Sequence, residues 1–257
     1  MGSPNFRFKQ FTVWHDRCAM KVGTDGVLLG AWCPLPHHPI ASSPYRILDI
    51  GTGSGLIALM LAQRLSSLSP IANNPYTIDA IDIDTDAVEQ AQYNFGQSPW
   101  SAQLHAHHST LQAWELKGES LELKDLQYHL IVSNPPYFQD SLKNPNAQRA
   151  TARHTDSLSY EELIKHSSRL LKADGILALV LPIEAETEIL ALATHFNLAP
   201  AHITRVHSKP GKPAKRLLIA LKPISDKLFP ITDMMYIESD TSPRSDEYKE
   251  LTKDFYL

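Results

Sequence analysis

Short apolar runs alternate with amphipathic helical stretches from residue 45 onward, and this alternation limits the fold more than any other feature of the chain. The run RILDI at 46–50 precedes LIALMLAQRL at 56–65, and IDAIDI at 78–83 precedes DAVEQAQYNF at 86–95. Repeated strand-turn-helix units of this kind build parallel sheets. Further strands are expected at 103–106, 129–133, 176–181 and 217–221, with helices at 160–171 and 184–195. The pattern predicts an α/β fold with helices on both faces of a mostly parallel sheet.

The 257 residues suit one elaborated domain better than two equal ones. Residues 6–14 alternate apolar and polar side chains as a half-buried strand or hairpin arm does. We therefore expect an N-terminal hairpin and helix over 1–40, followed by the main α/β domain over 41–257.

Composition narrows the possible partners and the compartment. A net charge of -4 excludes a protein that binds nucleic acid by bulk charge alone. The two cysteines, Cys18 and Cys33, are too few for a disulfide scaffold and favour a reducing compartment, with the cytoplasm as the default. Because no apolar run reaches about 18 residues and the N-terminus lacks the apolar core of a signal peptide, we expect a soluble protein without a membrane partner.

A glycine-rich turn, DIGTGSG, joins the first core strand to its helix. It contains Asp49, Gly51, Gly53 and Gly55. Glycines let the backbone turn tightly and approach a ligand, and the following helix offers unpaired N–H groups. The spacing is G-x-G-x-G followed by Leu56, whereas dinucleotide-binding proteins use G-x-G-x-x-G. The spacing therefore disfavours a nicotinamide-dependent dehydrogenase. A purely structural role is the other alternative, because glycine-rich turns also arise for close packing of a strand and a helix.

A carboxylate follows the next strand. Asp82 lies at the strand end, where a carboxylate can accept hydrogen bonds from both hydroxyls of an adenosine ribose. Asp84 is the neighbouring competitor for this role, and an acid in such a place can also be a simple turn residue. The glycine turn one unit earlier favours ribose binding by Asp82.

The stretch NPPY, residues 134–137, directly follows the apolar strand at 129–133. Successive prolines restrict the backbone, so the Asn134 side chain and the Pro135 carbonyl can be held rigidly. Two fixed acceptors can bind the hydrogens of an exocyclic amine and aim its nitrogen at an electrophile. Tyr137 can supply an aromatic face for an extruded base. A merely stiff loop is the competing interpretation.

These three motifs together resemble the class I S-adenosylmethionine-dependent methyltransferases that act on amino or amide nitrogens. The run VGTDGVLLGAW at 22–32 narrows the resemblance to the bacterial tRNA (adenine-N6)-methyltransferases that modify adenosine 37 of a valine tRNA. The likeness covers nearly the whole chain. It implies a Rossmann-like fold with a seven-stranded sheet, S-adenosylmethionine as methyl donor, tRNA as substrate, and no metal. It also implies that the segment over 1–40 packs on the cofactor site.

The resemblance also implies residue roles. Asn134, Pro135 and Tyr137 would be catalytic, and the cofactor would contact Asp49, Gly51, Gly53, Gly55, Asp82, Ile83, Thr110, Lys21, Thr24 and Asp25. Ile83 would lie against the adenine, and Thr110 stands where family members commonly have an aspartate. Thr24 or Asp25 can instead cap a helix.

A tRNA substrate requires cations near the catalytic loop, because the net charge is negative. Residues 201–222 contain six basic residues and no acid, which by themselves favour a solvated strand pair and turn. The expected substrate contacts are Pro136, Phe138, Lys143, Arg149, Arg153, Lys212, Lys215 and Arg216.

Other functions remain open at this point. A glutamine-amide methyltransferase acting on a translation factor would use the same NPPY loop, and a non-catalytic RNA-binding protein could keep the fold. The histidines His105, His107 and His108 invite a metal site, but successive residues of a strand point to opposite faces, so His105 and His107 would share a face that His108 does not. We expect an ordinary strand end there.

Overall fold

A computed structural model of the chain describes residues 3–18, 20–35, 44–68, 76–119, 126–136, 158–225 and 229–257. The expected boundary between residues 40 and 41 lies outside these ranges, as do Tyr137, Phe138, Lys143, Arg149 and Arg153. Among the described residues, no helix combines the length and apolar character needed to cross a membrane.

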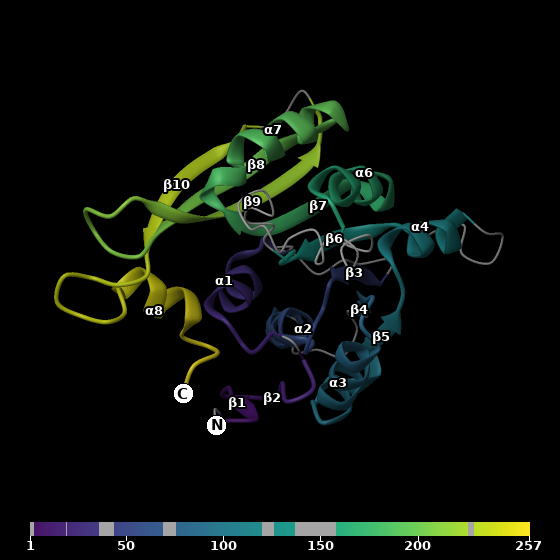
Figure 1. The fold of residues 1–257 in the computed structure, drawn as a ribbon, viewed down its shortest axis with the longest axis horizontal. Helices are drawn as coiled ribbons and strands as arrows, with labels where there is room; N and C mark the ends of the chain where they lie inside the picture. The colour runs from purple at the N-terminus through teal and green to yellow at the C-terminus, as the bar shows by residue number, and fades with distance from the viewer. Residues whose placement is uncertain are drawn as a thin grey trace, which may run out of the picture.

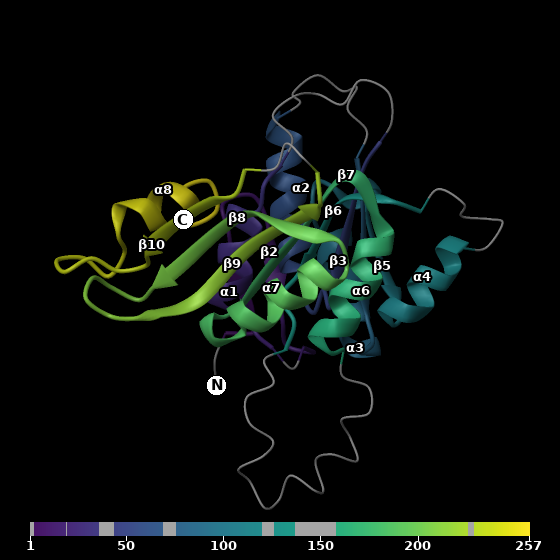
Figure 2. The ribbon, with the colours of Figure 1, turned by 90° about the horizontal axis from the view of Figure 1, so that it is seen from above.

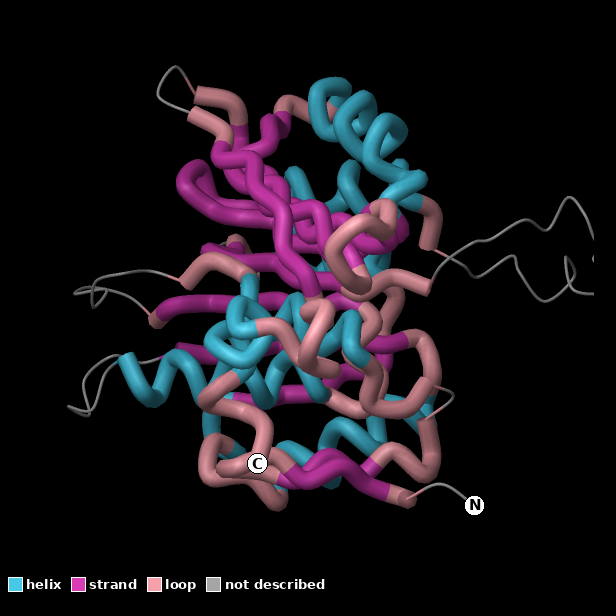
Figure 3. The backbone as a smooth tube through the Cα atoms, turned by 90° about the vertical axis from the view of Figure 1, so that its left-hand side faces the viewer, coloured by secondary structure: helices cyan, strands magenta, loops and turns pink. Residues whose placement is uncertain are grey.

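One large sheet crosses the molecule (Figure 3). In chain order its strands are β3 (Tyr45–Ile50), β4 (Tyr76–Asp82), β5 (Leu104–His108), β6 (Tyr128–Ser133), β7 (Leu171–Pro182), β8 (Leu198–His207), β9 (Ala214–Pro223) and β10 (Ile231–Tyr236). Their spatial order is β10-β8-β9-β7-β6-β3-β4-β5. β9 runs antiparallel to both of its neighbours, and the other pairings are parallel.

The strands expected from the sequence are confirmed at β3, β4, β5, β6, β7 and β9. The basic segment is also confirmed as a strand pair and turn, since β8 and β9 form a hairpin. The sheet has eight strands, one more than the seven expected. The addition is β10, an edge strand that pairs in parallel with β8 and exposes four of its six residues. A strand this exposed carries little of the hydrophobic pattern that reveals buried strands.

Helices cover both faces of the sheet, as the alternation of apolar runs predicts (Figure 1). Successive strand residues point to opposite faces, so Ile47 packs in one core and Leu48 in the other. The first core includes residues of α1 (Thr24–Trp32), α2 (Leu56–Leu68), α3 (Thr85–Gly96) and α8 (Asp246–Thr252). The second includes residues of α4 (Leu111–Glu119), α6 (Tyr160–Leu170) and α7 (Glu186–His195). Two short 3₁₀ helices, Ser101–Gln103 and Ile183–Ala185, precede β5 and α7.

The expected N-terminal hairpin is present as β1 (Asn5–Arg7) and β2 (Thr12–Trp14). It packs against the other end of the chain: the Lys9 amide donates to the Phe255 carbonyl at 2.9 Å, and the rings of Phe8 and Tyr256 stack at 6.0 Å. The hairpin and the C-terminal segment therefore lie together, on the face of the sheet that α1, α2, α3 and α8 cover (Figure 1).

The chain reverses direction across the sheet at β3. β4 and β5 lie on one side of β3, and β6 and β7 lie on the other. In open α/β sheets, ligands bind outside the carboxyl ends of the strands at such a switch point.

Candidate functional site

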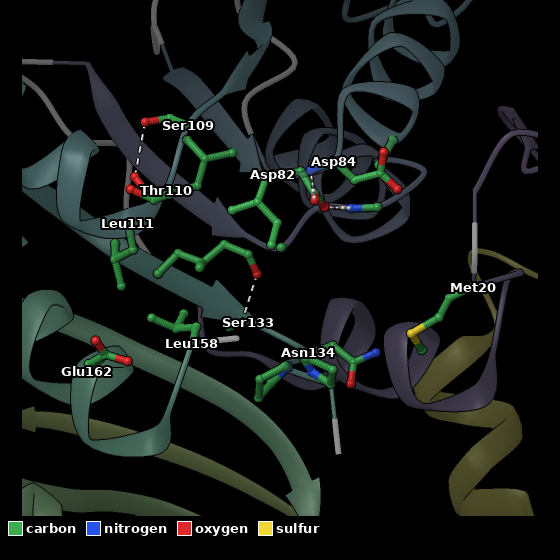
Figure 4. A pocket seen from close by; sticks show the side chains of 18 of the residues that line it. Met20, Asp82, Asp84, Ser109, Thr110, Leu111, Ser133, Asn134, Leu158 and Glu162 are labelled. Carbon is green, nitrogen blue, oxygen red and sulfur yellow. Dashed lines mark hydrogen bonds between the residues drawn. The ribbon is translucent and has the colours of Figure 1, made fainter. Parts of the chain in front are cut away.

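A cavity of about 680 Å³ lies at the carboxyl ends of β3, β4 and β6. This volume is in the range of pockets for small molecules and cofactors. In Figure 4, Asp82 and Asn134 lie at the ends of β4 and β6, the two strands that flank β3, with Met20 on one side and Thr110 and Leu111 on the other. The lining residues are Cys18, Met20, Ile50, Gly51, Gly53, Ile81, Asp82, Ile83, Asp84, Ala87, Ser109, Thr110, Leu111, Gln112, Ser133, Asn134, Pro135, Pro136, Leu158 and Glu162.

Two glycines of the DIGTGSG turn face this cavity. Gly51 and Gly53 have φ angles of 69° and 53°, in the left-handed region that glycine adopts without strain. The Gly51 amide donates to the Ile81 carbonyl at 2.9 Å, which ties the turn to the end of β4. A Cβ atom added at either glycine would meet no atom within 4 Å. The turn thus leaves open space where a ligand can approach the backbone.

Gly55 and Asp49 lie behind the turn and do not line the cavity. A Cβ at Gly55 would come within 2.5 Å of Phe95 Cε1, so this glycine allows α3 to pack closely. Asp49 is fully buried, and its Oδ2 accepts a hydrogen bond from the Thr52 hydroxyl at 2.7 Å. Burial raises the pKa of Asp49 to about 7. The positions of Gly55 and Asp49 therefore indicate that they shape the turn and do not contact a ligand.

The two competing aspartates have different tasks. Asp82 accepts from the Gly53 amide through Oδ2 at 2.9 Å and from the Asp84 amide through Oδ1 at 3.0 Å. Asp84 caps α3, because its Oδ1 accepts from the Asp86 amide at 2.9 Å. Each carboxylate oxygen has a second lone pair, so Asp82 can still accept hydrogen bonds from a ligand. Both aspartates line the cavity, so the choice of Asp82 as the ribose-binding acid stays a prediction.

The acceptor loop begins where β6 ends. The Ser133 hydroxyl donates to the Ile50 carbonyl at 2.8 Å and so joins the ends of β6 and β3. Asn134 is partly buried, Pro135 is buried and Pro136 is exposed, and all three line the cavity. This places the Asn134 side chain beside the glycine turn, as the strand order requires.

The opposite wall comes from the start of α4 and of α6. Thr110 caps α4, since its hydroxyl accepts from the Ala113 amide at 3.1 Å, and it also lines the cavity. Ile83 is 51% exposed and offers an apolar surface inside the cavity. Gln112 Nε2 donates to Glu162 Oε1 at 3.2 Å and links the two helices.

Sequence reasoning missed Cys18 and Met20, which line the cavity, and named Lys21, Thr24 and Asp25, which do not. No local motif marks Cys18 or Met20, because their position depends on contacts with α3. Asp25 instead binds Arg216, whose Nε donates to Asp25 Oδ1 and Oδ2 at 3.0 and 2.9 Å.

The basic turn between β8 and β9 lies at the same edge of the sheet as the cavity, because Arg216 is paired with Pro182 at the carboxyl end of β7. Lys212 in this turn and Lys215 at the start of β9 are both exposed. Figure 2 shows this hairpin projecting on the side of β10 and α8.

The histidines of β5 have separate partners. His107 contacts Asp79 Oδ1 at 3.3 Å, whereas His108 contacts the Ile83 carbonyl at 2.9 Å. Within the described ranges, no group of three or more His, Cys, Asp or Glu side chains could hold a metal ion.

The cavity is acidic. Its described lining contains the three carboxylates of Asp82, Asp84 and Glu162 and no lysine or arginine. Such a surface favours a cationic ligand and is unfavourable for a pyrophosphate.

Comparisons with known proteins agree with this geometry. Residues 35–202 match the family model of the methyltransferase small domain. A relative from Bacteroides fragilis, 46% identical over the whole chain and 99% of its own length, is named tRNA1(Val) (adenine(37)-N6)-methyltransferase. A relative from Flavobacterium psychrophilum with the same name is 44% identical over 98% of this chain and 99% of its own. A predicted O-methyltransferase from Agrobacterium tumefaciens, known from a crystal structure, shares the fold with a TM-score of 0.63, 19% identity and coverage of 90% and 96% of the two chains.

Proposed function

The chain belongs to the bacterial tRNA1(Val) (adenine(37)-N6)-methyltransferases, and we propose that it carries out their reaction in its acidic cavity. It is an S-adenosylmethionine-dependent enzyme that transfers a methyl group to N6 of adenosine 37 in a valine tRNA. The observation that carries the proposal is the meeting of an open glycine turn, Asp82 and Asn134 around one cavity.

The residues fit the methyl donor. S-adenosylmethionine supplies a methyl group that is already activated by a positive sulfonium, and the carboxylate lining favours that charge. We propose that Asp82 accepts hydrogen bonds from the ribose hydroxyls and that Ile83 packs against the adenine. Gly51 and Gly53 would leave room for the donor beside the backbone, while Asp49 and Gly55 shape the turn from behind.

Asn134 and Pro135 act on the acceptor amine in this proposal. The amine lone pair of adenine is delocalised into the ring, so the nitrogen is a weak nucleophile. The Asn134 side-chain oxygen and the Pro135 carbonyl would accept its two hydrogens and orient the nitrogen toward the methyl group. A strong general base is unnecessary, since the proton becomes acidic once the nitrogen is alkylated. Tyr137 and Phe138, outside the described residues, are proposed to contact the base.

The alternatives fit less well. The relatives' names do not favour a glutamine-amide methyltransferase or a non-catalytic RNA-binding protein. A nicotinamide-dependent dehydrogenase would have to bring a pyrophosphate into a cavity whose described lining holds three carboxylates and no lysine or arginine. We further propose that the protein works in the cytoplasm, where its tRNA substrate is made and used.

Mapping N6-methyladenosine in tRNA from cells with and without this gene tests the function. We expect position 37 of a valine tRNA to lose the methyl group in the deletion strain and to regain it when the intact gene is restored. Purified protein should also move labelled methyl groups from the cofactor to tRNA from that strain. Labelling of a protein fraction instead of tRNA would contradict the assignment.

A further inference from the structure

One face of α3 holds the N-terminal segment against the cavity. Gln90 Oε1 accepts from the Arg17 amide at 3.2 Å, and Glu89 Oε2 pairs with the Arg17 guanidinium at 3.3 Å. Asn94, at the end of the same helix, contacts Trp14. The segment that follows Trp14 carries Cys18 and Met20 into the cavity lining.

Asn94 makes the most complete of these contacts. Its Oδ1 accepts from the Trp14 amide at 3.0 Å, and its Nδ2 donates to the Trp14 carbonyl at 2.8 Å. The same Nδ2 donates its other hydrogen to the Ser54 carbonyl at 2.8 Å. The side chain is 1% exposed, so a lost hydrogen bond here would leave backbone groups unpaired and shielded from water. One carboxamide thus joins the N-terminal segment to the glycine turn.

The two joined segments form different walls of one cavity. Ser54 lies between Gly53, which faces the cavity, and Gly55, which packs on α3. At the other end, the Val22 amide donates to His15 Nδ1 at 3.5 Å and closes the loop that contains Cys18 and Met20. Because Asn94 holds Trp14, directly before this loop, it fixes where the loop begins.

We propose that Asn94 is a positioning residue for the methyl donor, which sets the N-terminal loop and the glycine turn at the separation that the donor needs. The inference rests on the proposed function. Asn94 does not line the cavity and therefore acts only through Trp14 and Ser54.

Gln63 provides a matched control. It is another buried carboxamide, 2% exposed, and its Nε2 donates to the Asp254 carbonyl at 2.8 Å. It joins α2 to the C-terminal segment and is not part of the cavity lining. Asn94→Asp and Gln63→Glu make the same chemical change, since each turns a donating amide into a carboxylate, which faces two backbone carbonyls at Asn94 and one at Gln63. Both should lower the melting temperature.

Binding of S-adenosylhomocysteine and alkylation of Cys18 separate the two roles. The chain has two cysteines, and Cys33 is fully buried, so a thiol reagent reports on Cys18. Burial and the nearby carboxylates of Asp82 and Asp84 raise the pKa of Cys18 to about 11, so the reaction is followed at a pH of about 9. In the wild type, S-adenosylhomocysteine should slow this alkylation.

Asn94→Asp should raise the dissociation constant of S-adenosylhomocysteine by about tenfold or more and remove the protection of Cys18. Gln63→Glu should leave both unchanged. Asn94→Ser, which avoids the buried charge, should also raise the dissociation constant, but by less. The inference would be overturned if folded Asn94 variants bound S-adenosylhomocysteine and protected Cys18 as the wild type does. It would also be overturned if Gln63→Glu raised the dissociation constant as much as Asn94→Asp. Failure of the wild type to bind S-adenosylhomocysteine would instead overturn the proposed function itself.

Discussion

Asn134 is proposed to act on the acceptor amine and not on the methyl donor, which separates its expected effect from that of Asp82. Asn134→Ala should lower the rate of methyl transfer by about two orders of magnitude. The dissociation constant of S-adenosylhomocysteine should stay within a few fold, since the glycine turn and Asp82 are unchanged. Single-turnover kinetics and calorimetry measure the two quantities. Loss of cofactor binding in a folded variant would show that the assigned role is wrong.

Asp82 and Asp84 provide a paired test at the same strand end. Asp82→Ala should weaken cofactor binding by about 1.5 to 3 kcal/mol, the scale of hydrogen bonds to a charged group. Asp84→Ala should instead cost about 1 kcal/mol of unfolding free energy, because it removes the cap of α3. Both variants should lose stability in chemical denaturation, since Asp82 also accepts hydrogen bonds from the Gly53 and Asp84 amides, but in calorimetry only Asp82→Ala should strongly weaken cofactor binding. Equal effects on binding would assign the ribose contact to both aspartates.

Asp49 makes the stability of the protein depend on pH. Burial raises its pKa from the ordinary value of 3.8 to about 7, so the folded state holds the proton more tightly than the unfolded state. The unfolding free energy should therefore fall as the pH rises between these values, by at most about 1.4 kcal/mol per pH unit, and level off above the higher one. Asp49→Asn keeps the acceptor for Thr52 and has no such titration. Denaturation at several pH values should show the variant gaining stability relative to the wild type as the pH rises, and a constant difference would refute the buried titration.

At the scale of elements, the ion pair between Asp25 and Arg216 joins the start of α1 to β9. The two side chains are 20% and 33% exposed, so solvent screens the interaction only in part. A double-mutant cycle with Asp25→Ala and Arg216→Ala should give a coupling energy of about 1 kcal/mol in unfolding experiments. Arg216→Ala should leave the salt dependence of tRNA binding unchanged, because its guanidinium is engaged with Asp25. A reduced salt slope would restore Arg216 as a phosphate contact.

The elements differ in how well their sequence reveals them. β3, β4 and β6 are largely buried on both faces, and each contains a short apolar stretch, which locates the strands within two or three residues. β10 has the exposed sequence ITDMMY and offers no such run. Within the site, the positions of Asp82 and Asn134 can be predicted because these polar residues stand at the end of an apolar strand. Cys18 and Met20 are not, since the contact that positions their loop joins residues 80 positions apart, Trp14 and Asn94.

At the scale of the whole molecule, an acidic protein must bind a polyanionic substrate, which requires an uneven distribution of its charges. The net charge is -4, and the cavity itself is lined by carboxylates. Cations that hold tRNA should therefore lie outside the cavity but at the same edge of the sheet. Lys212, in the turn between β8 and β9, and Lys215, at the start of β9, meet this condition and are exposed.

Replacing Lys212 and Lys215 together by alanine should weaken tRNA binding and lower its salt slope by about two units, one for each lost phosphate contact. Cofactor affinity should not change, because neither lysine lines the cavity. Lys172 at the start of β7 and Lys222 near the end of β9 lie at the opposite end of the strands and are partly buried, and their double replacement is the control. Filter binding at several salt concentrations compares the two variants with the wild type. If tRNA instead approaches from the other edge, the control pair will carry the larger loss, and the turn will prove to be an ordinary solvated connection.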